Sequence, residues 1–253
     1  MEIDLTGKIA VVTGAAGQLG RVITRTLASC GADVAVHYLN SKEPAEKLVD
    51  ELGKAGRRAI AVKADVTNEA DVFAMRDRVT HELGPADIIV NNAVIQYKWV
   101  SVLDQGIADF ESQFRSCVLH NVLMTKAFVP AMVQKKYGRV IGINTECAAK
   151  IEPNQAAYTA GKRGMDGVLR VLAKEVGPHG VTVNQVAPGW MISDRDRANG
   201  TEKNASYDPK VPLGHRGTDQ DIANAVAFLA SDLAAFITGV YLPVCGGNVM
   251  PGI

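Results

Sequence analysis

Short apolar runs alternate with longer amphipathic stretches along nearly the whole chain, and this alternation constrains the fold more than any other feature. The expected strands cover Lys8–Thr13, Asp33–Tyr38, Ala59–Lys63, Asp87–Asn91, Arg139–Ile143, Val181–Val186 and Val240–Val244. The expected helices cover Gln18–Cys30, Glu43–Ala55, Glu69–Leu83, one long helix from Ile107 to Phe128, the segment that carries Tyr158, and Asp219–Ser231. Such alternation is typical of a parallel sheet covered on both faces. We therefore expect an α/β protein with a doubly wound Rossmann-type parallel sheet and ligands beyond the carboxyl ends of the strands, all in a single domain over residues 1–253.

Composition excludes several other classes of protein. The chain has 253 residues, 47% of them hydrophobic, and its 27 basic residues balance its 27 acidic ones. We expect no nucleic-acid or membrane partner, because no basic stripe, polybasic run or signal peptide is present. The four cysteines are widely spaced, so we expect no metal site, and a reducing cytoplasm suits the chain best.

A glycine-rich turn follows the first expected strand, at Thr13–Gly20. Gly14 allows a tight turn, and Gly20 lets the next helix pack closely. The N-terminus of that helix would offer backbone N–H groups to a pyrophosphate. The turn therefore indicates a nucleotide site.

Tyr158 and Lys162 lie four residues apart, so on a helix they share a face. An ammonium group there can favour the phenolate and lower the pKa of the tyrosine from its usual value near 10. This pair predicts a tyrosine acid/base.

Several motifs in order resemble the short-chain dehydrogenase/reductase family, and in particular its 3-oxoacyl-[acyl-carrier-protein] reductase-like branch. They are Thr13–Gly20, Asp65-Val66, Asn91-Asn92-Ala93-Val94, Tyr158 with Lys162, Pro188-Gly189, Ile237-Thr238-Gly239 and Gly246-Gly247. The resemblance implies that Tyr158, Lys162 and Thr145 are catalytic. It implies a cofactor site made by Gly14, Gln18, Leu19, Gly20, Tyr38, Ser41, Asp65, Val66, Asn92, Ala93, Tyr158, Lys162, Pro188, Gly189, Met191 and Ser193.

The chain departs from the family pattern at four positions. Gln18 replaces the middle glycine of the turn, and Val94 replaces a glycine. Thr145 stands where the family has serine, which keeps the hydroxyl. Cys117 stands where the family has an asparagine of the proton relay, and we interpret it as a small core residue.

The residues after the second expected strand bear on cofactor choice. Tyr38 stands where family members specific for NAD carry an aspartate that would repel a 2′-phosphate. Asn40, Ser41 and Lys42 could receive that phosphate. We expect NADP to be preferred, with NAD possible as a second cofactor.

The polar stretch Trp190–Pro212 follows a strand end, where we expect a substrate lid at about 190–212. Glu146 could meet a cationic or polyhydroxyl substrate, or point to solvent. The resemblance also implies a homotetramer or dimer, paired through the long helix and the tyrosine helix.

Two functional hypotheses follow. The first is an NAD(P)-dependent oxidoreductase that transfers hydride between nicotinamide and a carbonyl or alcohol, as a 3-oxoacyl reductase or a polyol or sugar dehydrogenase. The second, motivated by the four departures, is a nucleotide-binding sensor or interaction protein with weak or no dehydrogenase activity.

Overall fold

Seven parallel strands form one sheet in the order β3-β2-β1-β4-β5-β6-β7 in the computed structural model, which describes residues 2–251. The strands are β1 (Ile9–Val12), β2 (Asp33–Tyr38), β3 (Ala59–Lys63), β4 (Ile88–Asn91), β5 (Gly138–Ile143), β6 (Val181–Pro188) and β7 (Tyr241–Val244). The order reverses between β1 and β4, where Val12 is in register with Val36 on one side and Val90 on the other. A ligand site is expected at the carboxyl ends of strands beside such a reversal.

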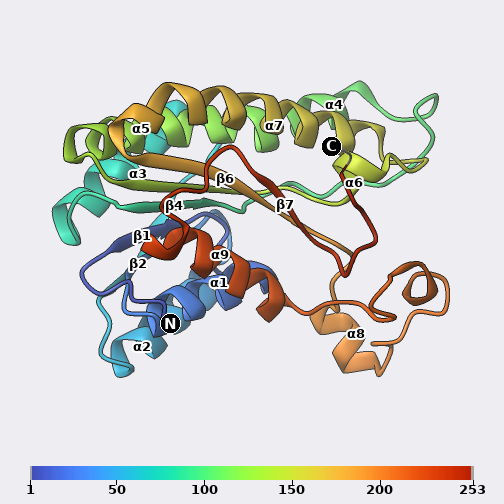
Figure 1. Ribbon diagram of the computed structural model, residues 1–253, viewed down its shortest axis with the longest axis horizontal. Coiled ribbons are helices and arrows are strands. Elements are labelled where there is room, and N and C mark those ends of the chain that lie inside the picture. The colour runs from blue at the N-terminus through green and yellow to red at the C-terminus, as the bar shows by residue number, and fades with distance from the viewer. Residues whose placement is uncertain (1, 252–253) are drawn as a thin grey trace.

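Helices cover both faces of the sheet (Figure 1). One layer holds α1 (Gln18–Ser29), α2 (Lys42–Lys54) and α9 (Asp219–Ala230). The other holds α3 (Glu69–Glu82), α4 (Ile107–Gln113), α5 (His120–Lys135) and α7 (Ala156–Val176). The short helices α6 (Cys147–Lys150) and α8 (Asp194–Asn199) lie near the ends of β5 and β6, and 3₁₀ turns cover Gly177–His179, Asp208–Lys210 and Asp232–Ala234. The expected doubly wound α/β fold is confirmed.

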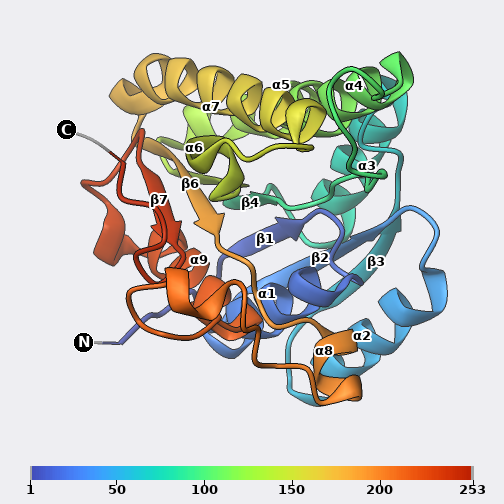
Figure 2. The same cartoon turned by 90° about the vertical axis from the view of Figure 1, so that its right-hand side faces the viewer.

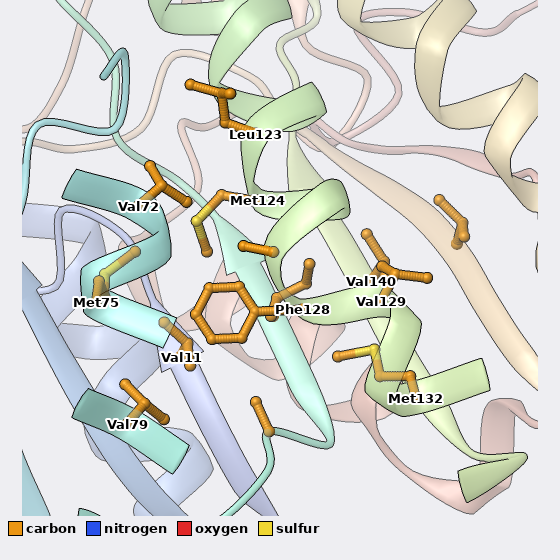
Figure 3. Packing of buried hydrophobic residues seen from close by; sticks show 14 of the residues in the cluster. Val11, Val72, Met75, Val79, Leu123, Met124, Phe128, Val129, Met132 and Val140 are labelled. Atoms are coloured by element: carbon orange, nitrogen blue, oxygen red, sulfur yellow. The ribbon is translucent and has the colours of Figure 1, made fainter. Parts of the chain in front are cut away.

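Each helical layer has its own apolar core. Figure 3 shows Phe128 and Met124 of α5 packed among Val72, Met75 and Val79 of α3. The opposite core is made by the other sides of the same strands with α1, α2 and α9, and includes Ile23, Leu27 and Ile222, all fully buried. The inner strands β1, β4 and β5 are buried on both sides, which explains their continuous apolar runs.

The long helix expected from Ile107 to Phe128 is not one regular α-helix. A π-helical segment, η1 (Phe114–Leu119), separates α4 from α5 and contains Cys117. Such segments add a residue to the turn, which apolar spacing alone does not reveal. Cys117 is 1% exposed and belongs to the core around α5, as the packing interpretation predicted.

The helical stretch Ile107–Lys135 is long and apolar enough to cross a membrane by length and composition alone. However, 61% of its most apolar window is buried inside the fold, and α5 packs against α3, α7, β4 and β5. Its apolar character is therefore that of a core helix.

Candidate active site

An elongated cavity of about 710 Å³ lies at the carboxyl ends of β1, β2 and β4, at the point where the strand order reverses. Its lining includes most of the residues expected to bind the cofactor, namely Gly14, Gln18, Leu19, Gly20, Tyr38, Ser41, Asp65, Val66, Asn92, Ala93, Tyr158, Lys162, Pro188 and Gly189. The fold thus brings together residues that are up to 175 positions apart in the chain, as the span from Gly14 to Gly189 shows.

Hydrogen bonds between the ends of β1 and β4 fix the glycine-rich turn. The Thr13 hydroxyl accepts from the backbone N–H groups of Asn92 at 2.9 Å and Ala93 at 3.0 Å. The Asn92 amide donates to the carbonyl of Thr13 at 2.9 Å. These bonds hold the two loops together at the base of the cavity.

His37 supports the same turn from the end of β2. Its Nδ1 accepts from the Gly14 N–H at 2.9 Å, and its Nε2 is 3.0 Å from the carbonyl of Ala64. Burial lowers the pKa of His37, so the ring is neutral and can accept and donate at once. Sequence reasoning did not select this residue, although a histidine in a buried strand was the available signal.

The start of α1 is suited to a pyrophosphate. No side chain caps this helix at Gly17, so its first-turn N–H groups remain available to an anion. A Cβ added at Gly20 would lie 2.1 Å from the carbonyl oxygen of Gly14, so only glycine allows the turn to approach the helix this closely. The residues present therefore fit a dinucleotide.

The end of β2 offers hydroxyl groups rather than a carboxylate. Tyr38, Asn40 and Ser41 line the cavity, and Ser41 precedes α2 without making a side-chain capping bond. The Lys42 ammonium is instead 3.6 Å from Glu46, and both side chains are exposed. A 2′-phosphate would thus meet Asn40 and Ser41 before Lys42.

Tyr158 and Lys162 lie on α7 at the other end of the cavity, with the Lys162 Nζ 5.7 Å from the centre of the tyrosine ring. Lys162 donates a 2.5 Å hydrogen bond to the carbonyl of Ile143. Burial raises the pKa of Tyr158 and lowers the pKa of Lys162. The expected lowering of the tyrosine pKa is not found, because loss of solvation raises this pKa and the hydrogen bond with Thr145 only partly opposes the rise.

A second cavity, of about 750 Å³, adjoins the first and shares Gln96, Thr145, Tyr158 and Gly189 with it. Thr145 is 7% exposed and its hydroxyl accepts from the Cys147 N–H at 3.2 Å. Aromatic rings form much of the wall. The Trp99 ring stacks on Tyr158 with centroids 5.8 Å apart.

Met191 and Ser193, which we expected to bind the cofactor, line this second cavity and are not among the residues that line the first. The Ser193 hydroxyl caps α8, donating to Asp196 at 2.6 Å and accepting from the Asp196 N–H at 3.1 Å. Sequence reasoning did not anticipate this helix, so it could not anticipate the cap. Their contact with a cofactor stays a prediction.

The expected lid, residues 190–212, is an ordered structure. It leaves the end of β6 and forms α8 outside the two helical layers (Figure 2). Arg216, 3% exposed, follows this segment in the chain and donates to Asp196 at 3.1 Å, to the carbonyl of Thr201 at 2.7 Å and to that of Glu202 at 2.5 Å. Hydrogen bonds from polar side chains hold this segment in place, together with the buried Val211 and Tyr207.

Gln18 links the glycine-rich turn to the lid. Its Nε2 donates to the Asp219 carboxylate at 3.0 Å and to the carbonyl of Ile192 at 3.4 Å, and its Oε1 accepts from the Asp194 N–H at 3.2 Å. A glycine at this position, as in the family motif, could make none of these bonds.

A doubly wound parallel sheet, a glycine-rich turn at the strand reversal and a half-buried tyrosine with a buried lysine beside it together define a dinucleotide-dependent oxidoreductase. Comparison with known proteins narrows this class. A family model described as Enoyl-(Acyl carrier protein) reductase matches residues 14–248. The chain is 38% identical over 258 residues to the 3-oxoacyl-[acyl-carrier-protein] reductase FabG of Escherichia coli (strain K12), covering 98% of this chain and 100% of that one.

Further similarity agrees with this assignment. The FabG of Staphylococcus aureus (strain N315) is 36% identical over 253 residues, covering 96% of this chain and 98% of the relative. A blue fluorescent protein from a metagenomic library, solved in complex with NADPH, superposes with a TM-score of 0.90 at 34% identity, covering 98% of this chain and 100% of that one. The chain belongs to the short-chain dehydrogenase/reductase family, and it is an NAD(P)-dependent oxidoreductase.

Proposed function

We propose that this enzyme reduces a carbonyl substrate with NADPH, and that Tyr158, Lys162 and Thr145 are its catalytic residues. One observation carries the proposal. The half-buried Tyr158 forms a wall common to the nucleotide cavity and the adjoining cavity, so its hydroxyl is within reach of both ligands. Such a position is required of a group that moves a proton while hydride passes between them.

The chemistry of the two side chains favours reduction. Because burial raises the pKa of Tyr158, the phenol is protonated near neutral pH and can donate to a carbonyl oxygen. A bound nicotinamide would supply the hydride at the carbonyl carbon. Thr145, whose hydroxyl lies on the same wall, orients the substrate oxygen, and Lys162 holds the nicotinamide ribose.

The end of β2 supports the choice of NADPH. Tyr38 presents no negative charge to a 2′-phosphate, and Asn40 and Ser41 can donate to it. The structural relative of known ligand also binds NADPH. NAD remains the second cofactor, because Gly17 offers no cation at the turn.

Two substrate classes follow from different observations. The FabG relatives point to a 3-oxoacyl substrate, which is our first choice. The second cavity mixes aromatic rings with polar and charged groups, including Glu152, Gln155 and Lys210, and this lining favours a polyol or sugar as the alternative. A nucleotide-binding sensor without turnover is less well supported, because Tyr158 and Lys162 are both in the cavity.

We also propose a homotetramer or dimer in the cytoplasm, with a small-molecule substrate and no nucleic-acid or membrane partner. Exposed apolar side chains on the long helix and α7 support pairing through these helices, since Ile107 is 72%, Phe114 58% and Val171 56% exposed in the single chain. Light scattering at micromolar concentration tests this assembly, and a stable monomer would contradict it.

The decisive test of the reaction is Tyr158→Phe, assayed by NADPH oxidation with a panel of 3-oxo esters and of keto sugars. We expect kcat to fall about 10³-fold, the range for loss of a positioned general acid. The Kd for NADPH should stay within twofold. Tyr97→Phe is the matched control. The Tyr97 hydroxyl accepts a 2.7 Å hydrogen bond from the backbone N–H of Tyr158, yet Tyr97 has no proposed chemical role. Parental turnover by Tyr158→Phe would remove Tyr158 from the mechanism.

A further inference from the structure

Glu146 directly follows the proposed catalytic threonine and is only 4% exposed, although it is charged. Both of its carboxylate oxygens are engaged. Oε1 accepts from the Tyr207 hydroxyl at 2.7 Å, and Oε2 accepts from the Asn248 amide at 2.9 Å. The alternative that Glu146 points to solvent is wrong, because the side chain is buried and lines the second cavity. Its contact with a substrate stays a prediction.

The partner of Glu146 belongs to the lid. Tyr207 is 7% exposed, and its hydroxyl, while donating to Glu146, accepts from the Trp190 N–H at 2.9 Å. The Tyr207 and Trp190 rings meet edge to face with centroids 5.4 Å apart. Burial raises the pKa of Tyr207, so the phenol keeps the proton that it donates. A chain of contacts therefore runs from the catalytic loop through Tyr207 to Trp190.

The residues of this chain of contacts form part of the wall of the second cavity. Glu146, Trp190 and Tyr207 all line it, and Trp190 is 51% exposed. The contacts of its indole include the Tyr207 ring and the Arg216 guanidinium, which lies 5.4 Å from the ring centre. The backbone just before the lid packs closely against Tyr207, because a Cβ on Gly189 would lie 2.8 Å from the Tyr207 hydroxyl oxygen.

We propose that Glu146 is a positioning residue that fixes Tyr207 and Trp190 and thereby limits the length of the substrate that the second cavity accepts. The proposal rests on the proposed function, since it assigns a specificity determinant to the same site. In this role Glu146 acts through Tyr207 and Trp190 rather than through contact with the substrate. The wall that it holds selects compact carbonyl compounds over those with long chains.

The test compares Glu146→Leu, Glu146→Gln and Tyr207→Phe with the parent on ethyl acetoacetate and ethyl 3-oxodecanoate. Leucine removes both acceptor oxygens, and Tyr207→Phe removes the donor while leaving the carboxylate in place. We expect each of these two variants to raise kcat/KM for the long ester relative to the short one at least about tenfold, the effect of one lost hydrogen bond to a charged group. Glu146→Gln keeps an acceptor for Tyr207 and should preserve the parental ratio within twofold.

Glu152→Gln is the matched control. Its carboxylate also lines the cavity, but it is 43% exposed and pairs with Lys150 at 3.0 Å rather than with the lid. The ratio of kcat/KM for the long ester to kcat/KM for the short ester should be the same in Glu152→Gln as in the parent. An unchanged ratio in both Glu146→Leu and Tyr207→Phe would overturn the proposal. So would a loss of activity on both esters in Glu146→Gln with no effect of Tyr207→Phe, because that pattern means direct contact with substrate.

A second readout does not depend on turnover. The chain has two tryptophans, so Trp99→Phe leaves Trp190 as the sole tryptophan, and its emission can be excited selectively over that of the tyrosines. In that background, acrylamide should quench Trp190 at least about twice as efficiently in Glu146→Leu and Tyr207→Phe as in the parent. Equal quenching in all variants would refute the positioning role even if activity is measurable. If the parent reduces no ester while quenching changes as expected, the proposed function fails and the positioning role stands. Should Glu146→Leu not fold, Tyr207→Phe alone decides.

Discussion

The sheet core and the expected lid, residues 190–212, are held together by different forces. The core buries strands such as β1 and β4 completely between two apolar layers. The lid is bonded to the buried Arg216 that follows it, and it is joined to neighbouring elements through Gln18, Glu146 and Asp219. The stabilisation from buried apolar area adds up over many side chains and depends little on any single contact. A buried polar network, in contrast, is disrupted when one partner is removed. Damage to the core should therefore spread, and damage to the lid should stay local.

The largest effect is expected in the core. Ile89→Ala removes a fully buried side chain from the layer against α3 and α5 and should lower the global free energy of unfolding by about 3 kcal/mol. Urea unfolding measures it. Leu103→Ala is the control, because that side chain is 92% exposed and its truncation should cost almost nothing. Similar losses in the two variants would contradict the buried position of Ile89.

A substitution at Arg216, whose side chain is bonded to the lid, should have a smaller effect on stability, and that effect should be local. Arg216→Met removes the bonds to Asp196, Thr201 and Glu202 and should raise the opening equilibrium of the lid roughly thirtyfold, about 2 kcal/mol. Hydrogen exchange should report this within residues 194–212, with NADPH affinity kept within twofold. Arg195→Met, at an exposed position, is the control. Global unfolding of Arg216→Met would remove the distinction between the two regions.

Acid should weaken the two regions at different pH. Burial lowers the pKa of His120 from 6.5 to about 3, so the folded chain stays unprotonated there while the unfolded chain takes up a proton below about pH 6.5. The free energy of unfolding should therefore decrease as the pH falls from 6.5, by at most about 1.4 kcal/mol per pH unit for this ring. Hydrogen bonds from Ser193, followed by Arg216, lower the pKa of Asp196 from 3.8 to about 2. Its stabilising contribution is complete above pH 3.8 and is lost as the pH falls through 2.

Urea titrations at pH 7 and pH 5, beside hydrogen exchange of the lid, separate these two effects. Global stability should drop between the two pH values, and His120→Gln should reduce that drop. Local protection of α8 should change little. A lid that opens before the core weakens would show that groups other than Asp196 control it.

The smallest expected effect concerns cofactor choice. Ser41→Ala should reduce the preference for NADPH over NADH about tenfold, through loss of one hydrogen bond to a phosphate. Lys42→Ala should change it less than twofold, because that ammonium is exposed and directed at Glu46. Fluorescence titrations with both reduced cofactors decide between them. The reverse order of effects would restore Lys42 as the phosphate ligand that the sequence suggested.

The same contrast explains what could be predicted. The pattern of apolar residues located every strand to within one or two residues. An inner strand that is buried on both faces has a nearly continuous apolar run, as in Ile88–Asn91. Motif resemblance located Tyr158, Lys162 and the glycine-rich turn. The π-helical segment around Cys117 and the bond from Gly14 to His37 could not be predicted, because each depends on contacts made only after folding.

The lid shows this limit most clearly. Its charged residues are also what an exposed, irregular loop would contain, so composition could not distinguish the two. The capping bond from Ser193 to Asp196 was predictable from the sequence, because a serine three residues before an acidic residue is a local pattern typical of a helix start. The burial of Arg216 and Glu146 was not, because polar residues become buried only when their partners, distant in the chain, are in place.

Gln18 has a consequence for engineering toward a family consensus, an approach that usually stabilises proteins. Gln18→Gly would restore the family motif, but it would leave the buried Asp219 carboxylate with Arg197, at 3.4 Å, as its remaining side-chain partner. The Asp194 N–H would lose its acceptor as well. The substitution is thus conditional on its surroundings, and a sequence-averaged design that treats position 18 independently of position 219 would weaken the chain that it sets out to improve.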